Sequence, residues 1–243
     1  MEQDYLIADR TIRISSIHNR VHELCRDYRC DRVDDVDINV VTSQEDIDFE
    51  LNRPSRTPSS LTHDAYLEEL AVYRAISERM PSFDTVLVHG SCVAVDGAAY
   101  LFCAPSGTGK STHTFLWRKM LGERALMVND DKPLIRIKDG AALAYGTPWD
   151  GKHHLSTNIA VPLRSICILG RSDSNHIEPL ERDDAWTTIM RQVYRPSDPA
   201  ATAATLTLVN QLVDSVDLWR LSCNKEEEAA ELSYAAMSGK ELS

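Results

Sequence analysis

Near the middle of the chain lies the run Ala104-Pro105-Ser106-Gly107-Thr108-Gly109-Lys110-Ser111-Thr112. It fits the phosphate-loop pattern G-x-x-x-x-G-K-[ST], with Ala104 in place of the first glycine. Small residues let successive backbone N–H groups turn toward one phosphate, and the helix that follows adds its positive N-terminal end. The side chain of Lys110 is expected to reach the β- and γ-phosphates, and the Ser111 hydroxyl to hold Mg²⁺. Residues 106–112 are therefore the predicted nucleotide contacts.

The segments on either side of this run have the patterns of a strand and a helix. Residues 93–95 and 99–102 alternate as strands around Asp96-Gly97, a two-residue hairpin signal. A helix is predicted from Lys110 to Leu121, followed by a strand over residues 125–128. The run thus lies between the second arm of a hairpin and a helix, as phosphate binding by a loop requires.

An acidic pair follows the next strand. Asn129-Asp130-Asp131 begins about twenty residues after Lys110, so one helix and one returning strand would bring it beside the loop. Two neighbouring carboxylates can divide the chemistry there. One holds Mg²⁺, directly or through water, and the other accepts the proton of an attacking hydroxyl.

The N-terminal part of the chain has strand patterns and no phosphate-binding motif. Residues 5–7, 11–14 and 35–40 have strand patterns, and residues 52–60, rich in Pro, Ser and Arg, indicate a loop. Residues 62–80 are a predicted helix, on which Glu68 and Glu69 are interpreted as part of an exposed face. We therefore expect a small β-rich region over residues 1–60 and a main domain over residues 61–243.

The C-terminal half alternates strands and helices. Residues 135–137 and 142–144 predict a second hairpin, about Asp139-Gly140. Further strands are expected over residues 164–169 and 218–221, and helices over residues 183–193, 201–213 and 225–237. This alternation predicts an α/β domain.

The composition excludes some classes of partner. The 243 residues include 37 Asp and Glu against 26 Lys and Arg, a formal net charge of −11. An acidic surface repels phosphate backbones, so neither nucleic acid nor an anionic membrane is expected as a partner. The polar, acidic N-terminus and the absence of a long apolar run predict a cytoplasmic protein.

The order of elements resembles the catalytic domain shared by HPr kinase/phosphorylase and ATP-dependent phosphoenolpyruvate carboxykinase. The resemblance rests on residues 105–111, on Asp130-Asp131 and on His89-Gly90 ahead of the hairpin, and it covers roughly residues 84–170. It implies a phosphate-loop domain with a mixed sheet and a hairpin before the loop.

The resemblance also implies roles for individual residues. Lys110 and Ser111 would bind the triphosphate and the metal, Asp130 and Asp131 would supply metal ligation and the catalytic base, and His89 would lie near the transferred phosphoryl group. Which carboxylate is the base stays open. Three arginines are alternative phosphate-stabilising groups: Arg164, Arg171 and Arg191.

Two departures narrow the resemblance. No Glu-Arg-Gly-Leu-Gly stretch follows the acidic pair, which argues against HPr as the substrate, and the chain is too short for a carboxykinase. The likeness is greatest to the small HPr kinase-related proteins.

A second loop, over residues 146–154, gathers Gly146-Thr147-Pro148-Trp149-Asp150-Gly151-Lys152-His153-His154. The related small proteins have a similar Gly-Thr-Pro-Trp-x-Gly-Lys run. We interpret Trp149, Lys152 and His153 as acceptor-site residues, with Trp149 forming a wall and Lys152 neutralising negative charge. A surface loop whose tryptophan packs on the core is the alternative.

The leading hypothesis is an ATP-dependent, Mg²⁺-requiring kinase that transfers the γ-phosphoryl group to a hydroxyl of a small molecule. The alternatives are a kinase acting on an HPr-like carrier or a modified peptide, and a nucleotide-binding regulatory module without turnover. Homo-oligomers are expected from the family resemblance alone.

Overall fold

The computed structural model describes residues 1–53 and 63–240, which divide into two compact units, Met1–Met80 and Pro81–Ser243. The sequence pattern puts a boundary near residue 60, and residues 54–60 of the expected loop lie outside the described residues. Helix α3 (Asp64–Arg79) belongs to the first unit because it packs against elements of that unit.

The first unit is a small sheet with three helices among its described residues. Strands β1 (Glu2–Ile7) and β2 (Arg10–Ser15) pair antiparallel, and β2 pairs parallel with β3 (Ile38–Val41). Helix α3 packs on α1 (Arg20–Leu24), α2 (Gln44–Leu51) and β3. Helices α1 and α2 were not expected in this β-rich region. A capping box of Ser43 and Asp46 starts α2, and it is a local signal that the strand interpretation overlooked.

The interpretation of Glu68 and Glu69 as an exposed helix face is wrong. Both side chains are buried, and Glu68 is only 1% exposed. The carboxylate of Glu68 accepts hydrogen bonds from the backbone N–H groups of Ile17 and His18 and from the Thr42 hydroxyl. A buried carboxylate requires such partners, so Glu68 ties α3 to the loops of its own unit.

The second unit contains most of the expected elements. Its described residues form a nine-stranded mixed sheet whose central order is β4-β8-β9-β10-β6-β5-β7, with β12 beside β10 and β11 beside β12. The strands are β4 (Thr85–Leu87), β5 (Gly90–Val95), β6 (Ala98–Cys103), β7 (Ala125–Asn129), β8 (Leu134–Lys138), β9 (Ala141–Tyr145), β10 (Ala160–Arg171), β11 (His176–Pro179) and β12 (Asp217–Cys223). The helices are α4 (Lys110–Leu121), α5 (Arg182–Met190), α6 (Pro199–Ser215) and α7 (Glu227–Ser238).

Both predicted hairpins are confirmed. Strands β5 and β6 meet at Asp96-Gly97, and β8 and β9 meet at Asp139-Gly140. All four turn residues have positive φ, as a two-residue turn of this type requires.

Strand β10 joins the two halves of the sheet. Its first residues pair antiparallel with β9, and its later residues run parallel to β6 on one side and to β12 on the other. The sheet is therefore mixed, in agreement with the α/β class predicted from the sequence.

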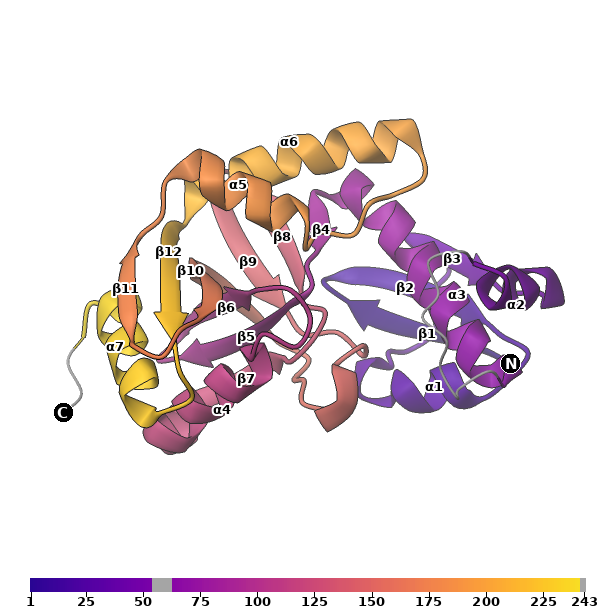
Figure 1. Cartoon of the computed structure of the whole chain (residues 1–243). Coiled ribbons are helices and arrows are strands. Elements are labelled where there is room, and N and C mark those ends of the chain that lie inside the picture. The colour runs from indigo at the N-terminus through magenta and orange to yellow at the C-terminus, as the bar shows by residue number, and fades with distance from the viewer. Residues whose placement is uncertain (54–62, 241–243) are drawn as a thin grey trace. The chain divides into compact units, whose positions relative to one another are not determined.

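Helices cover both faces of this sheet (Figure 1). Helices α5 and α6 lie on one face, where Ile189 and Leu212 join a cluster of buried strand residues. Helices α4 and α7 lie on the other, where Trp117 and Tyr234 pack with Phe102. Among residues 1–53 and 63–240, no helix has the length and hydropathy needed to cross a bilayer.

Strand order brings three chain segments together at one edge of the sheet. Strand β5 lies between β6 and β7 and is antiparallel to both. The start of β5 therefore lies beside the ends of its two neighbours. Gly90 is paired with Cys103, and Cys92 with Asn129. His89, the segment after β6 and the acidic pair after β7 consequently meet at this edge.

Candidate functional site

The glycine-rich loop, residues 104–109, connects β6 to α4, as the sequence predicts. Gly107 has φ +77° and Gly109 has φ +125°, values that L residues with a side chain rarely adopt. Neither glycine has another atom within 4 Å of the position of a Cβ. The loop therefore needs glycine there for its backbone conformation rather than for space.

Lys110 is the first residue of α4, and its side chain turns back over the loop. The ammonium Nζ donates a hydrogen bond to the carbonyl oxygen of Ala104 at 3.0 Å, and the residue is only 7% exposed. Burial lowers the pKa of Lys110, while Cys103, Asp131 and Asp130 act in the opposite direction. A cation held this way favours an anion that can replace the lost hydration.

Of the three arginines considered from the sequence, Arg171 lies at the glycine-rich loop. Its guanidinium donates to the carbonyl oxygens of Gly107 and of Thr108, the latter at 3.3 Å. Arg164 instead donates to the carbonyl oxygen of Met237 at 3.1 Å, near the end of α7. Arg171 therefore braces the loop from the end of β10.

Asp130 is held by a chain of hydroxyl groups behind it. The Ser91 hydroxyl donates to Oδ1 of Asp130 at 2.7 Å and lies 2.8 Å from the hydroxyl of Thr114. Asp130 is 7% exposed. One carboxylate oxygen is thus engaged with Ser91, which fixes the orientation of the group.

Asp131 stands beside two cationic or potentially cationic side chains. Oδ1 lies 3.4 Å from Nε2 of His89, and Oδ2 accepts a hydrogen bond from Lys132. Burial raises the pKa of the Asp131 carboxyl, but the hydrogen bond from His89 and the charge of Lys132 outweigh it and lower that pKa to about 2. Asp131 is accordingly ionised at neutral pH.

Asn129 organises the turn that presents both carboxylates. Its side chain is fully buried, and Oδ1 accepts from the backbone N–H groups of Asp131 and Lys132 at 2.8 and 2.6 Å. Its amide nitrogen donates to the carbonyl oxygen and the hydroxyl of Thr147 at 3.0 and 3.1 Å. Asn129 therefore links the acidic pair to the second loop.

The second loop, residues 146–154, contributes two groups to the site. Lys152 and His153 are exposed and line the same cavity as the acidic pair. Trp149 is 7% exposed and does not line that cavity, so the structure supports the alternative in which this tryptophan packs on the core. A Cβ on Gly146 would lie 2.0 Å from the carbonyl oxygen of Thr157, so this glycine is required by close backbone approach.

These residues enclose a cavity of about 410 Å³, here called the polar pocket. Its lining brings together residues from the glycine-rich loop, α4, the acidic pair, the segment before β5 and the second loop. It is formed by His89, Ser106, Gly107, Gly109, Lys110, Ser111, Thr112, Asp130, Asp131, Gly151, Lys152 and His153. Of the predicted site residues, Thr108 and Trp149 lie outside it.

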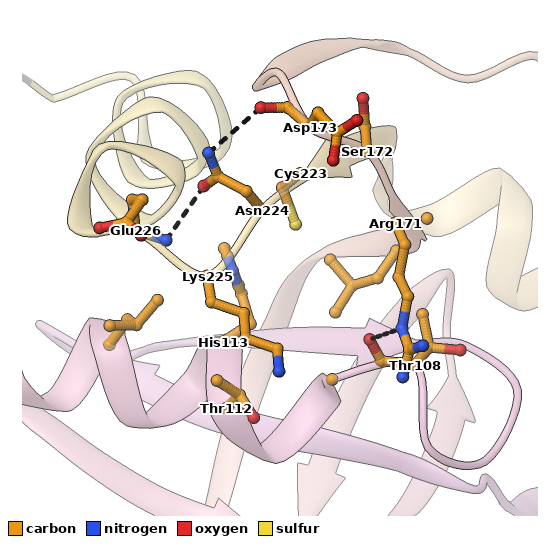
Figure 2. Close-up of a pocket in the computed structure, with 14 residues that line it drawn as sticks. Thr108, Thr112, His113, Arg171, Ser172, Asp173, Cys223, Asn224, Lys225 and Glu226 are labelled. Atoms are coloured by element: carbon orange, nitrogen blue, oxygen red, sulfur yellow. Dashed lines mark hydrogen bonds between the residues drawn. The ribbon is translucent and has the colours of Figure 1, made fainter.

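A second cavity, of about 550 Å³, lies on another side of the glycine-rich loop (Figure 2). We call it the β10–β12 pocket because the ends of those strands line it. Gly109 and Thr112 line both pockets, so the two meet at the start of α4. In Figure 2, Arg171 reaches Thr108 on one side, and Asn224 bonds to Asp173 on another. Leu116 and Leu169 add apolar walls.

Comparison with known proteins gives structural likenesses but no likeness in sequence. No family model matches the chain, and no curated protein matches its sequence. A solved structure of the Hpr(Ser) kinase/phosphatase from Coxiella burnetii matches with a TM-score of 0.36 and 10% identity, over 63% of this chain and 93% of that chain. This likeness establishes neither the family of the chain nor its activity.

Some residues of the site were not singled out from the sequence. Asn129, Ser91, Thr114 and Thr147 position the acidic pair, and Lys132 contacts it. An Asn before two acidic residues at a strand end is a local turn signal, because its side chain accepts from the N–H groups that follow. The hydroxyl chain gives no such signal, since its members lie far apart in the sequence.

Proposed function

We propose that this protein is an ATP-dependent kinase that transfers the γ-phosphoryl group to a hydroxyl of a small molecule. One observation carries the proposal: the polar pocket joins a buried lysine and a glycine-rich loop to two carboxylates and a histidine. The proposed chemistry is that of the HPr kinase/phosphorylase and phosphoenolpyruvate carboxykinase families, which the sequence resembles.

The nucleotide occupies two pockets in this proposal. The phosphates lie in the polar pocket, where Lys110 and the N-terminal end of α4 attract negative charge. The nucleoside lies in the β10–β12 pocket, which has the size and mixed lining of a small-molecule site. The shared residues Gly109 and Thr112 mark the place where the phosphate chain crosses between them.

The donor groups of the polar pocket fit a magnesium ion. Mg²⁺ prefers oxygen ligands and is commonly held by one or two carboxylates together with substrate phosphates and water. The carboxylate of Asp130 and the hydroxyl of Ser111 would hold it, and among the described residues no cluster of three or more His, Cys, Asp or Glu offers a protein-only metal site. When bound, the ion neutralises charge on the phosphates.

Asp131 is the proposed base. Its carboxylate accepts the proton of the acceptor hydroxyl as the new bond from oxygen to the γ-phosphorus forms. The bond between that phosphorus and the bridging oxygen breaks, and ADP leaves with the electron pair. A carboxylate with a pKa of about 2 is a weak base, which suffices because the transition state is loose and the proton moves late. His89 orients Asp131 through its ring nitrogen.

A transfer assay tests this proposal. Purified protein is incubated with Mg²⁺, ATP labelled at the γ-phosphate and a pool of hydroxylated metabolites. We expect ADP release that depends on the acceptor, and a loss of about a hundredfold in turnover for Asp131→Asn. The matched control is Asp139→Asn, an exposed carboxylate at the β8–β9 turn, which should retain full turnover.

Three other outcomes of the assay would change the proposal. Equal turnover in Asp131→Asn and wild type would contradict the assignment of the base. Transfer to a carrier protein or peptide but to no metabolite would make the protein a protein kinase. Tight ATP binding without turnover, for any acceptor, would favour a regulatory nucleotide-binding module.

A further inference from the structure

A third cavity, of about 270 Å³, borders the polar pocket, and we call it the side pocket. Ser111, Thr112, Asp130 and His153 line both cavities. A molecule in the side pocket would therefore reach the proposed phosphoryl group and metal without crossing the space proposed for the nucleoside. This position suits the acceptor.

One face of α4 forms much of the side pocket. Ser111, Phe115 and Arg118 follow one another at spacings of four and three residues, so their side chains share one face of the helix. Ser111 and Arg118 are about 10 Å apart along the helix axis, at a rise of about 1.5 Å per residue. Side chains on a helix lean toward its N-terminus, so Arg118 leans toward the phosphoryl end of the pocket.

The charge of Arg118 has no partner in the part of the chain that the structure describes. Across residues 1–53 and 63–240 its side chain makes no hydrogen bond and no ion pair, although the protein carries a net charge of −11. Its neighbour Lys119, in contrast, is paired with Glu227. A half-buried guanidinium in a pocket, without a carboxylate to neutralise it, is a ready partner for an anionic group of a ligand.

Apolar side chains also line the side pocket. Phe115, Met127 and Leu155 form its walls, and Met127 is only 5% exposed. Phe115 is 58% exposed, so part of its surface is open to a ligand in the pocket. These walls favour a ligand with an apolar body between its two polar ends.

We propose that the side pocket binds the acceptor and that the acceptor is a small hydroxy acid with an apolar body. Its carboxylate pairs with Arg118, its apolar part packs on Phe115 and Met127, and its hydroxyl points toward Asp131 in the polar pocket. This inference rests on the proposed kinase function, and it adds the chemical class of the substrate. Arg118 is here a specificity-determining residue and does not touch the reacting atoms.

Matched pairs of acceptors test the inference. The probes are 2-hydroxy-3-phenylpropanoate, 3-hydroxy-3-phenylpropanoate and 4-hydroxy-4-phenylbutanoate, each with its uncharged amide. Binding of each probe is measured by calorimetry with Mg²⁺ and a non-hydrolysable ATP analogue, and transfer is measured with ATP. We expect at least one acid to bind about tenfold more tightly than its amide, because only the acid can form charge-assisted hydrogen bonds with the Arg118 guanidinium.

Variants of α4 show whether Arg118 is the cause. Arg118→Ala should bind the preferred acid about tenfold more weakly, and its KM for that acid should rise by the same factor. Its affinity for the corresponding amide should not change. ATP affinity should stay at the wild-type value in this variant. Lys119→Ala is the matched control, because it removes a cation from the next position of the same helix and lies outside the three cavities described. It should keep the preference for the acid.

The outcomes separate this inference from the kinase proposal. Equal binding of every acid and its amide, or an unchanged preference in Arg118→Ala, would overturn the assignment of the side pocket even if phosphoryl transfer is observed. A preference for the acid that depends on Arg118, in a protein that binds no ATP, would overturn the kinase proposal and leave only a carboxylate-binding pocket.

Discussion

The two loops that border the polar pocket are built on different principles. In the glycine-rich loop, residues 104–109, Gly107 and Gly109 adopt backbone conformations that favour glycine and have open space around them, and Arg171 supports the loop from the end of β10. The second loop, residues 146–154, owes its shape to distant contacts. Gly146 lies against the backbone of Thr157, and Thr147 is bonded to Asn129.

This difference suggests that the glycine-rich loop binds a ligand and that the second loop positions the acidic pair. Open space beside Gly107 and Gly109 leaves room for a ligand at the glycine-rich loop, whereas backbone atoms of Val128 and Thr157 crowd Gly146 at the start of the second loop. The second loop instead fixes the turn that carries Asp130 and Asp131. Substitutions in the first loop should therefore change ligand affinity, and substitutions at the start of the second should change stability.

The largest expected effect comes from paired glycine substitutions. In Gly146→Ala the new Cβ would meet backbone oxygens at 2.0 and 2.8 Å, so we expect a loss of more than about 3 kcal/mol in the free energy of unfolding. Gly107→Ala meets no atom and should lose only about 1–2 kcal/mol, from its positive φ. Urea unfolding of both variants measures the difference. Equal losses of unfolding free energy would show that the two loops do not differ in how closely their glycines are packed.

Asn129→Ala should have the next largest effect. It leaves two backbone N–H groups, one carbonyl and one hydroxyl without their buried partner, which should cost about 3 kcal/mol of unfolding free energy. The control is Asn210→Ala on α6, an exposed site, where we expect a change within about 0.5 kcal/mol. Similar unfolding curves for the two variants would show that Asn129 does not hold the turn.

A smaller effect should appear as a dependence of stability on pH. The Asp131 carboxyl has a pKa lowered from 3.8 to about 2, so its ionised form is favoured in the folded state. The stability it contributes is present above about pH 4 and is lost as the pH falls through about 2, by about 2 kcal/mol in total. Unfolding curves collected from pH 5 to 2 should fall less steeply for Asp131→Asn than for wild type. If the stability of wild type and of Asp131→Asn depended on pH in the same way, the interaction of Asp131 with His89 and Lys132 would be contradicted.

The same contrast explains what the sequence could predict. The glycine-rich loop, helix α4 and the hairpins at Asp96-Gly97 and Asp139-Gly140 depend on neighbouring residues, so local patterns indicate them correctly. The convergence of Lys110 and the acidic pair follows from one helix and one strand between them, and it too was predictable. The buried state of Glu68 and Trp149 depends on contacts far along the chain, which no local pattern records.

Arg118 shows the same limit within the site. Its spacing from Ser111 is visible in the sequence, but the absence of an ion-pair partner for it among residues 1–53 and 63–240 is a property of the folded chain. Helix α2 is a different case, since its capping box at Ser43 was a local signal that a strand interpretation masked.

The central claim is that the glycine-rich loop binds the phosphates of ATP through Lys110. Calorimetric titration of Mg²⁺-ATP into wild type and Lys110→Met tests it most directly, because methionine keeps the buried stem and removes the desolvated charge, with the loss of one hydrogen bond to the Ala104 carbonyl. We expect wild type to bind and the variant to bind at least about tenfold more weakly, with a thermal unfolding curve recorded to show that the variant is folded. Equal ATP affinity in the two proteins, or no binding by wild type, would contradict the claim.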